Sequence, residues 1–130
     1  MWVFTTKGFV SVVAWRGCRK TVCVRARSLA HLQALFPGAE VVTLRDADYR
    51  HRARVTRDEF ATMLLREAQA VQYDNFKDAI VDHAYHDACL DAWHAMRPLQ
   101  EVRARAYGRA QRPLWPPEEG AADDEAQLPW

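Results

Sequence analysis

Cysteine, serine and long apolar runs are all scarce in this 130-residue sequence. The three cysteines, Cys18, Cys23 and Cys89, form no C-x-x-C pair, which excludes a disulfide scaffold and a four-thiolate zinc site. No apolar run is longer than the four residues of Val12–Trp15, far below the roughly 18 that span a bilayer, and no secretory signal follows Met1. We therefore expect a soluble, cytoplasmic protein that makes no membrane contact.

Catalytic motifs are absent as well. The only serines are Ser11 and Ser28, and neither lies in a Gly-x-Ser-x-Gly elbow or beside an evident His and Asp arrangement. A phosphate-binding loop and a dinucleotide-binding fingerprint are also missing. The sequence thus favours a non-enzymatic protein without a cofactor, although it leaves an enzyme open.

The formal net charge of +1 conceals a strong asymmetry along the chain. Residues 1–57 carry eleven Lys or Arg against three acids, a net charge of +8, whereas residues 58–96 carry two against eight, a net charge of −6. Residues 97–130 contribute a further −1. Such a distribution arises when a basic sheet and acidic helices face each other or face two different partners.

The N-terminal residues predict a β-hairpin and a third strand. β-Branched and aromatic residues fill 2–6 and 9–15, on either side of a Lys7-Gly8 turn in which the glycine takes a positive φ. Residues 21–27 then alternate in polarity, so that one face of this strand carries the apolar residues Val22, Val24 and Ala26.

A short helix and two extended segments follow. Ser28 is a typical N-cap for a helix over residues 29–36, which Pro37 and Gly38 end. Residues 41–44 predict a short extended piece. Residues 49–55 alternate most clearly, with Tyr49, His51, Ala53 and Val55 on one side and the three arginines Arg50, Arg52 and Arg54 on the other.

The acidic half predicts helices over residues 57 to about 97. Thr56 and Glu59 fit a capping box at the start of a helix over about 57–72, whose apolar positions are Phe60, Leu64, Ala68 and Val71. Asp74 or Asn75 caps a further helical stretch that Pro98 bounds. An apolar stripe at helical spacing, Tyr85, Cys89, Trp93 and Met96, predicts that Trp93 is buried against Phe60 or Leu64 and the apolar sheet face.

Together these elements predict an α+β fold. We expect an antiparallel sheet of about four strands, beginning with the N-terminal hairpin and covered on one face by helices, in a ferredoxin-like or related two-layer sandwich. Residues 1–112 form this single domain. Residues 113–130 hold four of the six prolines, five acids and no base, a composition that predicts a disordered acidic tail.

Several short segments, taken in order, resemble a group of small, uncharacterised bacterial proteins. They are the N-terminal MWVFT with GFVSVV, then VRAR, then DADYR with Arg52, and finally Tyr73 with NFKD at residues 75–78. The resemblance covers about residues 1–97. It implies no particular activity, so no catalytic residue is transferred from it.

The strongest candidate site is an arginine face on the sheet. If strand 21–27 is an antiparallel neighbour of strand 49–55, Arg25 and Arg27 join Arg50, Arg52 and Arg54, at a spacing that suits the phosphates of an extended single strand. Tyr49 or Trp15 would offer a stacking surface. The alternative is a solvated face, or one whose arginines pair with acids such as Asp78, Asp82 and Asp87.

The sequence contains two other candidate sites, both for a metal ion. Asp46, Asp48 and Glu59 are the carboxylates that a metal-dependent hydrolase would use. The second set is His83, His86, Cys89 and His94, which do not converge from a single straight helix. We predict no bound metal at either set.

The sequence therefore predicts, first, a protein-binding module that acts as a small cytoplasmic regulator or inhibitor of a larger protein. The alternative is a nucleic-acid-binding protein that uses the basic sheet face, and a metal-dependent hydrolase is the second alternative. For either kind of binding, the predicted contact residues are Arg25, Arg27, Tyr49, Arg50, Arg52 and Arg54.

Overall fold

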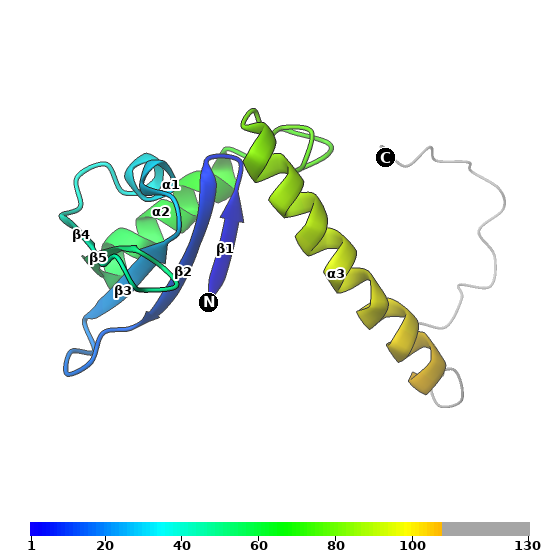
Figure 1. Ribbon diagram of the computed structural model, residues 1–130, viewed down its shortest axis with the longest axis horizontal. Coiled ribbons are helices and arrows are strands. Elements are labelled where there is room, and N and C mark those ends of the chain that lie inside the picture. The colour runs from blue at the N-terminus through cyan, green and yellow to red at the C-terminus, as the bar shows by residue number, and fades with distance from the viewer. Residues whose placement is uncertain (108–130) are drawn as a thin grey trace, which may run out of the picture. The chain divides into compact units, whose positions relative to one another are not determined.

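The computed structural model of this chain describes the backbone of residues 1–107 and the side chains of residues 1–100. The chain divides into two compact units, Met1–His86 and a second that begins at Asp87. The sheet and the helices α1 (Leu29–Leu35) and α2 (Arg57–Gln69) belong to the first unit (Figure 1).

The predicted N-terminal hairpin is confirmed. Strand β1 (Trp2–Thr5) pairs with β2 (Gly8–Ala14), and Thr5 lies opposite Gly8. The turn is therefore Thr6-Lys7 rather than the predicted Lys7-Gly8, and Gly8 is the first residue of β2. Its φ of +156° and its contact with α1 still require a glycine.

Three more strands complete the sheet. Strand β3 (Thr21–Ala26) pairs with β2 and with β5 (His51–Thr56), and β4 (Val41–Thr43) pairs with the far side of β5. Every pair is antiparallel, and the strand order is β1-β2-β3-β5-β4. Because β5 lies between them, β3 and β4 run parallel to each other, joined by α1 (Figure 1).

The α+β class is confirmed, with a five-stranded antiparallel sheet in place of the four or so strands expected. The fifth strand is the short segment at residues 41–43. A ferredoxin-like fold has a helix after its first strand, whereas β1, β2 and β3 follow one another directly here. The architecture is therefore the related two-layer sandwich.

The core lies between the sheet and the two helices. Alternate residues of β2, β3 and β5 point into it, and all are nearly inaccessible to solvent: Val10, Val12, Val22, Val24, Ala26, Ala53 and Val55. From the helical layer, Leu32, Leu35, Phe36 and Met63 close the core, with Phe60 and Leu64 packed at its edge. Sequence periodicity identified most of these positions and missed Met63.

Helix α2 begins with the predicted capping box. The Glu59 amide donates a hydrogen bond to the Thr56 hydroxyl, and the Glu59 carboxylate accepts one from the Thr56 amide. This backbone hydrogen bond, together with one from the Thr56 hydroxyl, holds the pKa of Glu59 below its usual value. At Ser28 the cap is weaker, because its side chain makes no capping hydrogen bond to α1.

The second helical stretch differs from the prediction at both ends. Residues 70–82 form turns and irregular structure, and α3 (His83–Tyr107) begins after Asp82, whose carboxylate accepts a hydrogen bond from the Tyr85 amide. Neither Asp74 nor Asn75 caps a helix. At its other end, α3 continues through Pro98, which removes only one hydrogen bond from the helix ladder.

The prediction that Trp93 is buried is wrong. Its side chain is 50% exposed and Met96 is 62% exposed, whereas Tyr85 and Cys89 on the same stripe are buried. The four residues have the predicted helical spacing, but only the first two of them, Tyr85 and Cys89, are buried. Trp93 contacts the ring of His94, with 4.9 Å between ring centroids.

Two further observations bear on the expected organisation. The boundary at residue 112 and the acidic tail over 113–130 lie outside the described residues, so both stay predictions. Among the described helices, none combines the length and apolar character that crossing a bilayer demands.

Candidate binding site on the open sheet face

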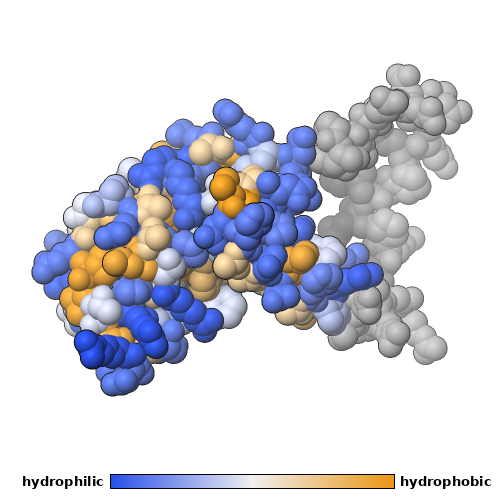
Figure 2. All heavy atoms as spheres, turned by 45° about the horizontal axis from the view of Figure 1, so that its top comes forward, coloured by the Kyte–Doolittle hydropathy of each residue, from blue (hydrophilic) through white to orange (hydrophobic). Residues whose placement is uncertain are grey.

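One face of the sheet carries no helix of the first unit. Because residues alternate along a strand, the neighbours of the core positions point to the opposite side, which we call the open face. Its strand residues include Trp2, Phe4, Phe9, Ser11, Val13, Cys23, Arg25, Val42, Arg52 and Arg54. Figure 2 shows apolar patches bordered by strongly hydrophilic residues on one side of the molecule.

The register brings three of the predicted arginines together. Arg25 of β3 lies opposite Arg52 of β5, and Arg54 lies two residues further along β5 on the same face. Adjacent arginines on neighbouring strands repel each other, and polar contacts hold each guanidinium. Arg25 donates a hydrogen bond to the Ser11 hydroxyl at 2.8 Å, Arg52 to the Tyr49 carbonyl at 3.2 Å and Arg54 to the Thr21 hydroxyl at 3.2 Å. The Arg25 Nε is buried and has no hydrogen-bond partner among the described residues.

Tyr49 joins this group in a way that alternation did not predict. It precedes β5, in an irregular turn, so the two-residue period does not apply to it and its ring lies on the arginine side. The Arg25 and Arg27 guanidinium carbons lie 4.9 Å and 5.1 Å from the ring centroid. With only 6% of Tyr49 exposed, its ring is occupied by these cations and offers no stacking surface.

Trp15 and Arg54 form a second such pair. The Arg54 guanidinium carbon lies 4.9 Å from the centroid of the Trp15 ring, which is 37% exposed. Arg50 is different. It lies outside β5, and its exposed side chain makes no hydrogen bond, ion pair or ring contact within the described part of the chain.

An aromatic cluster occupies the β1 end of the open face. The Phe4 and Phe9 rings stack with centroids 4.5 Å apart, and Trp2 packs edge-on against Phe9 at 5.8 Å. Phe9 also contacts the Tyr49 ring at 6.3 Å, so the cluster is continuous with the arginines. Trp2 is 68% exposed, which leaves apolar ring surface available to a partner. The sequence analysis missed this cluster, although strand alternation places Trp2, Phe4 and Phe9 on one face.

The two layers of the sandwich differ in charge. Acidic Asp58, Glu59 and Glu67 belong to α2 in the helical layer, and Glu67 pairs there with Lys7 at 2.8 Å. Within the described residues, the one ion pair that any of the five predicted arginines makes joins Arg52 to exposed Asp48 at 3.8 Å. Asp78 and Asp82 pair with none of them. Three of the five, Arg25, Arg27 and Arg54, are thus stacked on aromatic rings and make no ion pair with the described residues.

Two adjoining hollows are cut into the open face. Both are bordered by Trp15, Cys23 and Arg52. The β4 hollow, of about 550 Å³, adds Glu40, Val42, Leu44 and Arg54. The β2 hollow, of about 370 Å³, adds Val13, Arg16 and Arg25. Their volumes are those of small-molecule sites, and their rims are cationic.

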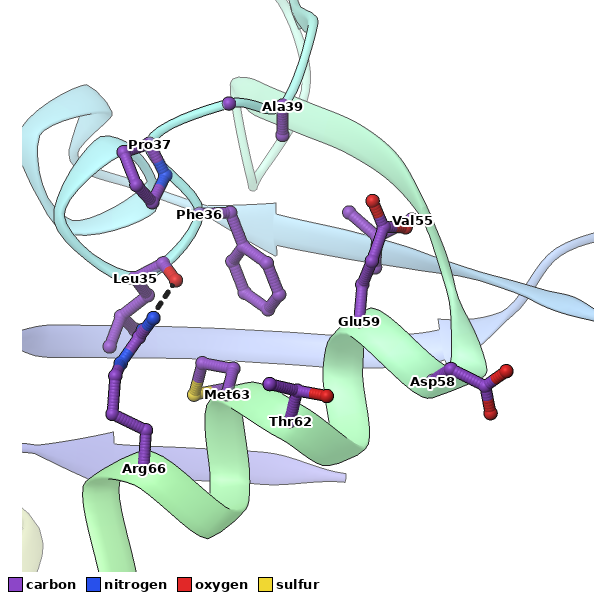
Figure 3. Close-up of a pocket in the computed structure, with 11 residues that line it drawn as sticks. Leu35, Phe36, Pro37, Ala39, Val55, Asp58, Glu59, Thr62, Met63 and Arg66 are labelled. Carbon is purple, nitrogen blue, oxygen red and sulfur yellow. Dashed lines mark hydrogen bonds between the residues drawn. The ribbon is translucent and has the colours of Figure 1, made fainter.

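A third hollow, of about 400 Å³, lies between α1 and α2 (Figure 3). Leu35 and Phe36 extend toward Met63, and the Arg66 guanidinium reaches across to donate a hydrogen bond to the Leu35 carbonyl at 2.9 Å. Asp58 points away from the other side chains (Figure 3). The Arg66 side chain in this hollow therefore links α2 to α1, and the apolar wall of the hollow is the edge of the core.

The predicted metal ligands do not gather. The Asp48 carboxylate accepts a hydrogen bond from the Tyr49 amide, and the Glu59 carboxylate accepts one from the Thr56 amide in the α2 cap. Among residues with described side chains, no three His, Cys, Asp or Glu lie close enough together to hold a metal ion.

Cys18, in the loop between β2 and β3, lies beside the Trp15 and Arg54 pair. Hydrogen bonds from the Thr21 hydroxyl, the backbone and Arg54 lower the pKa of its thiol to about 7. About half of the Cys18 side chains are therefore ionised near neutral pH.

We expect the rate at which iodoacetamide modifies Cys18 to rise with pH, with its midpoint near pH 7. Thr21→Val is expected to move that midpoint upward, and mass spectrometry follows both reactions. A midpoint near the ordinary value of about 8.5 in the parent protein would contradict this assignment.

Comparisons with protein-family models, with curated proteins and with solved structures found no match to this chain. The function proposed below therefore follows from the geometry of the open face.

Proposed function

We propose that this protein binds single-stranded nucleic acid through the open sheet face and has no enzymatic role. The observation that carries the proposal is that Arg25, Arg52 and Arg54 lie on one uncovered face, where Arg25 and Arg54 stack on aromatic rings and Arg52 makes an ion pair only with exposed Asp48. Guanidinium groups with spare donors bind phosphate, and exposed rings stack on bases without sequence preference.

The charge distribution supports the same choice. The acids of α2 belong to the layer on the other side of the sheet, so they do not screen the arginines at close range. We therefore expect a polyanion to be attracted most strongly to the open face. The sequence predicts a protein partner first. We propose nucleic acid instead, because the register of β3 and β5 groups the arginines and because their one ion pair within the described residues joins Arg52 to Asp48.

Salt dependence tests the proposal. We expect a labelled oligonucleotide of about 12 nucleotides to bind at low salt. With three or four phosphate contacts, raising the salt from roughly 50 to 200 mM is expected to weaken binding about 20- to 50-fold. The double variant Arg52→Ala with Arg54→Ala removes two contacts and reduces the salt slope by about 1.4. Fluorescence anisotropy measures both quantities.

A matched control removes the same charge elsewhere. Arg66→Ala with Lys77→Ala takes two positive charges from α2 and the segment after it, and its salt slope is expected to equal that of the parent protein. Circular dichroism melts establish that both double variants are folded. An unmodified protein that fails to bind at low salt, or an Arg52 and Arg54 variant that binds normally, contradicts the proposal.

A protein partner is the second candidate, with the protein acting as a small cytoplasmic regulator or inhibitor. Its support is the exposed apolar surface on the same face, where Trp2 is 68% and Val42 56% exposed. Pull-down from the native host with the parent protein and with Trp2→Ala distinguishes the two. A partner that is retained after nuclease treatment, and lost in the variant, favours this candidate.

A further inference from the structure

We propose that the β4 hollow holds one base of the bound strand and that Glu40 selects a base carrying an amino group, such as cytosine, over thymine or uracil. This inference rests on the proposed function, because it assigns a role to a part of the same face.

The hollow combines apolar walls with a cationic rim. Val42 and Leu44 are 56% and 43% exposed, and with the Trp15 ring they supply the flat or apolar surface on which a base packs. Arg52 and Arg54 border the same hollow, so a phosphate attached to the base meets a guanidinium at the rim. The volume of about 550 Å³ has room for one nucleoside.

Glu40 is the one acidic residue that lines this hollow. Its side chain is exposed and makes no hydrogen bond or ion pair with the described residues. A carboxylate weakens the attraction of the rim for phosphate. We therefore assign Glu40 a different role, as the acceptor of a hydrogen bond from the base. Ionised carboxylates only accept hydrogen bonds, and the exocyclic amino group of cytosine donates one where thymine has a carbonyl oxygen.

Oligo-dC and oligo-dT of equal length provide the test: cytosine has an amino donor where thymine has a carbonyl oxygen, and the two bases differ besides at N3 and in the 5-methyl group of thymine. At pH about 8 and low salt, we expect the parent protein to bind oligo-dC roughly fivefold to tenfold more tightly than oligo-dT. In Glu40→Gln the ratio is expected to fall below about twofold, because an amide both donates and accepts.

A charge-matched control is Asp46→Asn, which removes a negative charge two residues after Leu44 without altering the lining of the hollow. It is expected to strengthen binding of both oligonucleotides slightly and to preserve their ratio. Equal binding of the two by the parent protein, or a ratio unchanged in Glu40→Gln, overturns this inference and leaves the proposed function standing. Absence of binding to either oligonucleotide removes both.

Discussion

Replacing Leu32 with alanine is expected to lower the free energy of unfolding by about 2–5 kcal/mol. Leu32 is fully buried, and it packs from α1 onto the apolar side of β2 and β3. Truncating it removes buried apolar surface and leaves a cavity that the sheet cannot collapse to fill. The loss is a large share of the roughly 5–15 kcal/mol by which a small domain is stable.

Leu29 provides the control, because it lies one turn earlier on the same helix and is 38% exposed. Leu29→Ala changes helix propensity by the same amount as Leu32→Ala, so the difference between the two variants isolates burial. We expect the Leu29 variant to lose less than about 1 kcal/mol. Urea melts with equal slopes measure both; coincident melts would show that α1 does not pack on the sheet as described.

Gly8→Ala is expected to destabilise the protein by about 2–4 kcal/mol, since strain and overpacking act together. The φ of +156° is one that side-chain-bearing residues rarely adopt, and a Cβ there would lie 2.5 Å from the Cβ of His31 and 2.9 Å from its Cα. Because these atoms belong to the backbone or its first side-chain carbon, His31→Ala does not relieve the clash. Helix α1 has to shift away from β2.

The control is Gly38→Ala, in the segment that follows α1, where an added Cβ would meet no atom within 4 Å. This variant is expected to melt within about 0.5 kcal/mol of the parent protein, or slightly above it, because alanine restricts the unfolded chain. Thermal melts of the two variants and of the Gly8→Ala, His31→Ala double variant provide the measurement. Rescue of Gly8→Ala by His31→Ala contradicts the proposed clash.

Much of the sheet was predictable because period-two alternation is a local signal. Val22, Val24 and Ala26 point into the core as their spacing indicates, and so do Ala53 and Val55. The α2 cap was predictable for the same reason, since Thr56 and Glu59 are three residues apart and satisfy each other's backbone. Each of these predictions needs only near neighbours in the sequence.

The errors concern features that depend on distant residues. Period alone could not decide whether residues 73–82 are helical, and they are not. The stripe through Trp93 has the right spacing, but burial of its second half requires a surface to cover it. Tyr49 was assigned to the strand, and its place among the arginines follows from the turn before β5. The arginines of the candidate site, and the presence of Tyr49 and Trp15 beside them, were therefore predictable, whereas the stacking of the arginines on these two rings was not.

Stacking both Arg25 and Arg27 on the Tyr49 ring also has an entropic consequence. A free arginine samples many rotamers, and ordering such a side chain on binding costs about 0.5–1.5 kcal/mol. Here the Tyr49 ring restricts both side chains before any ligand binds, so their conformational entropy is lost when the protein folds and not when it binds. The same two cations, mounted on a surface without Tyr49, would bind an anion more weakly although their charge is unchanged.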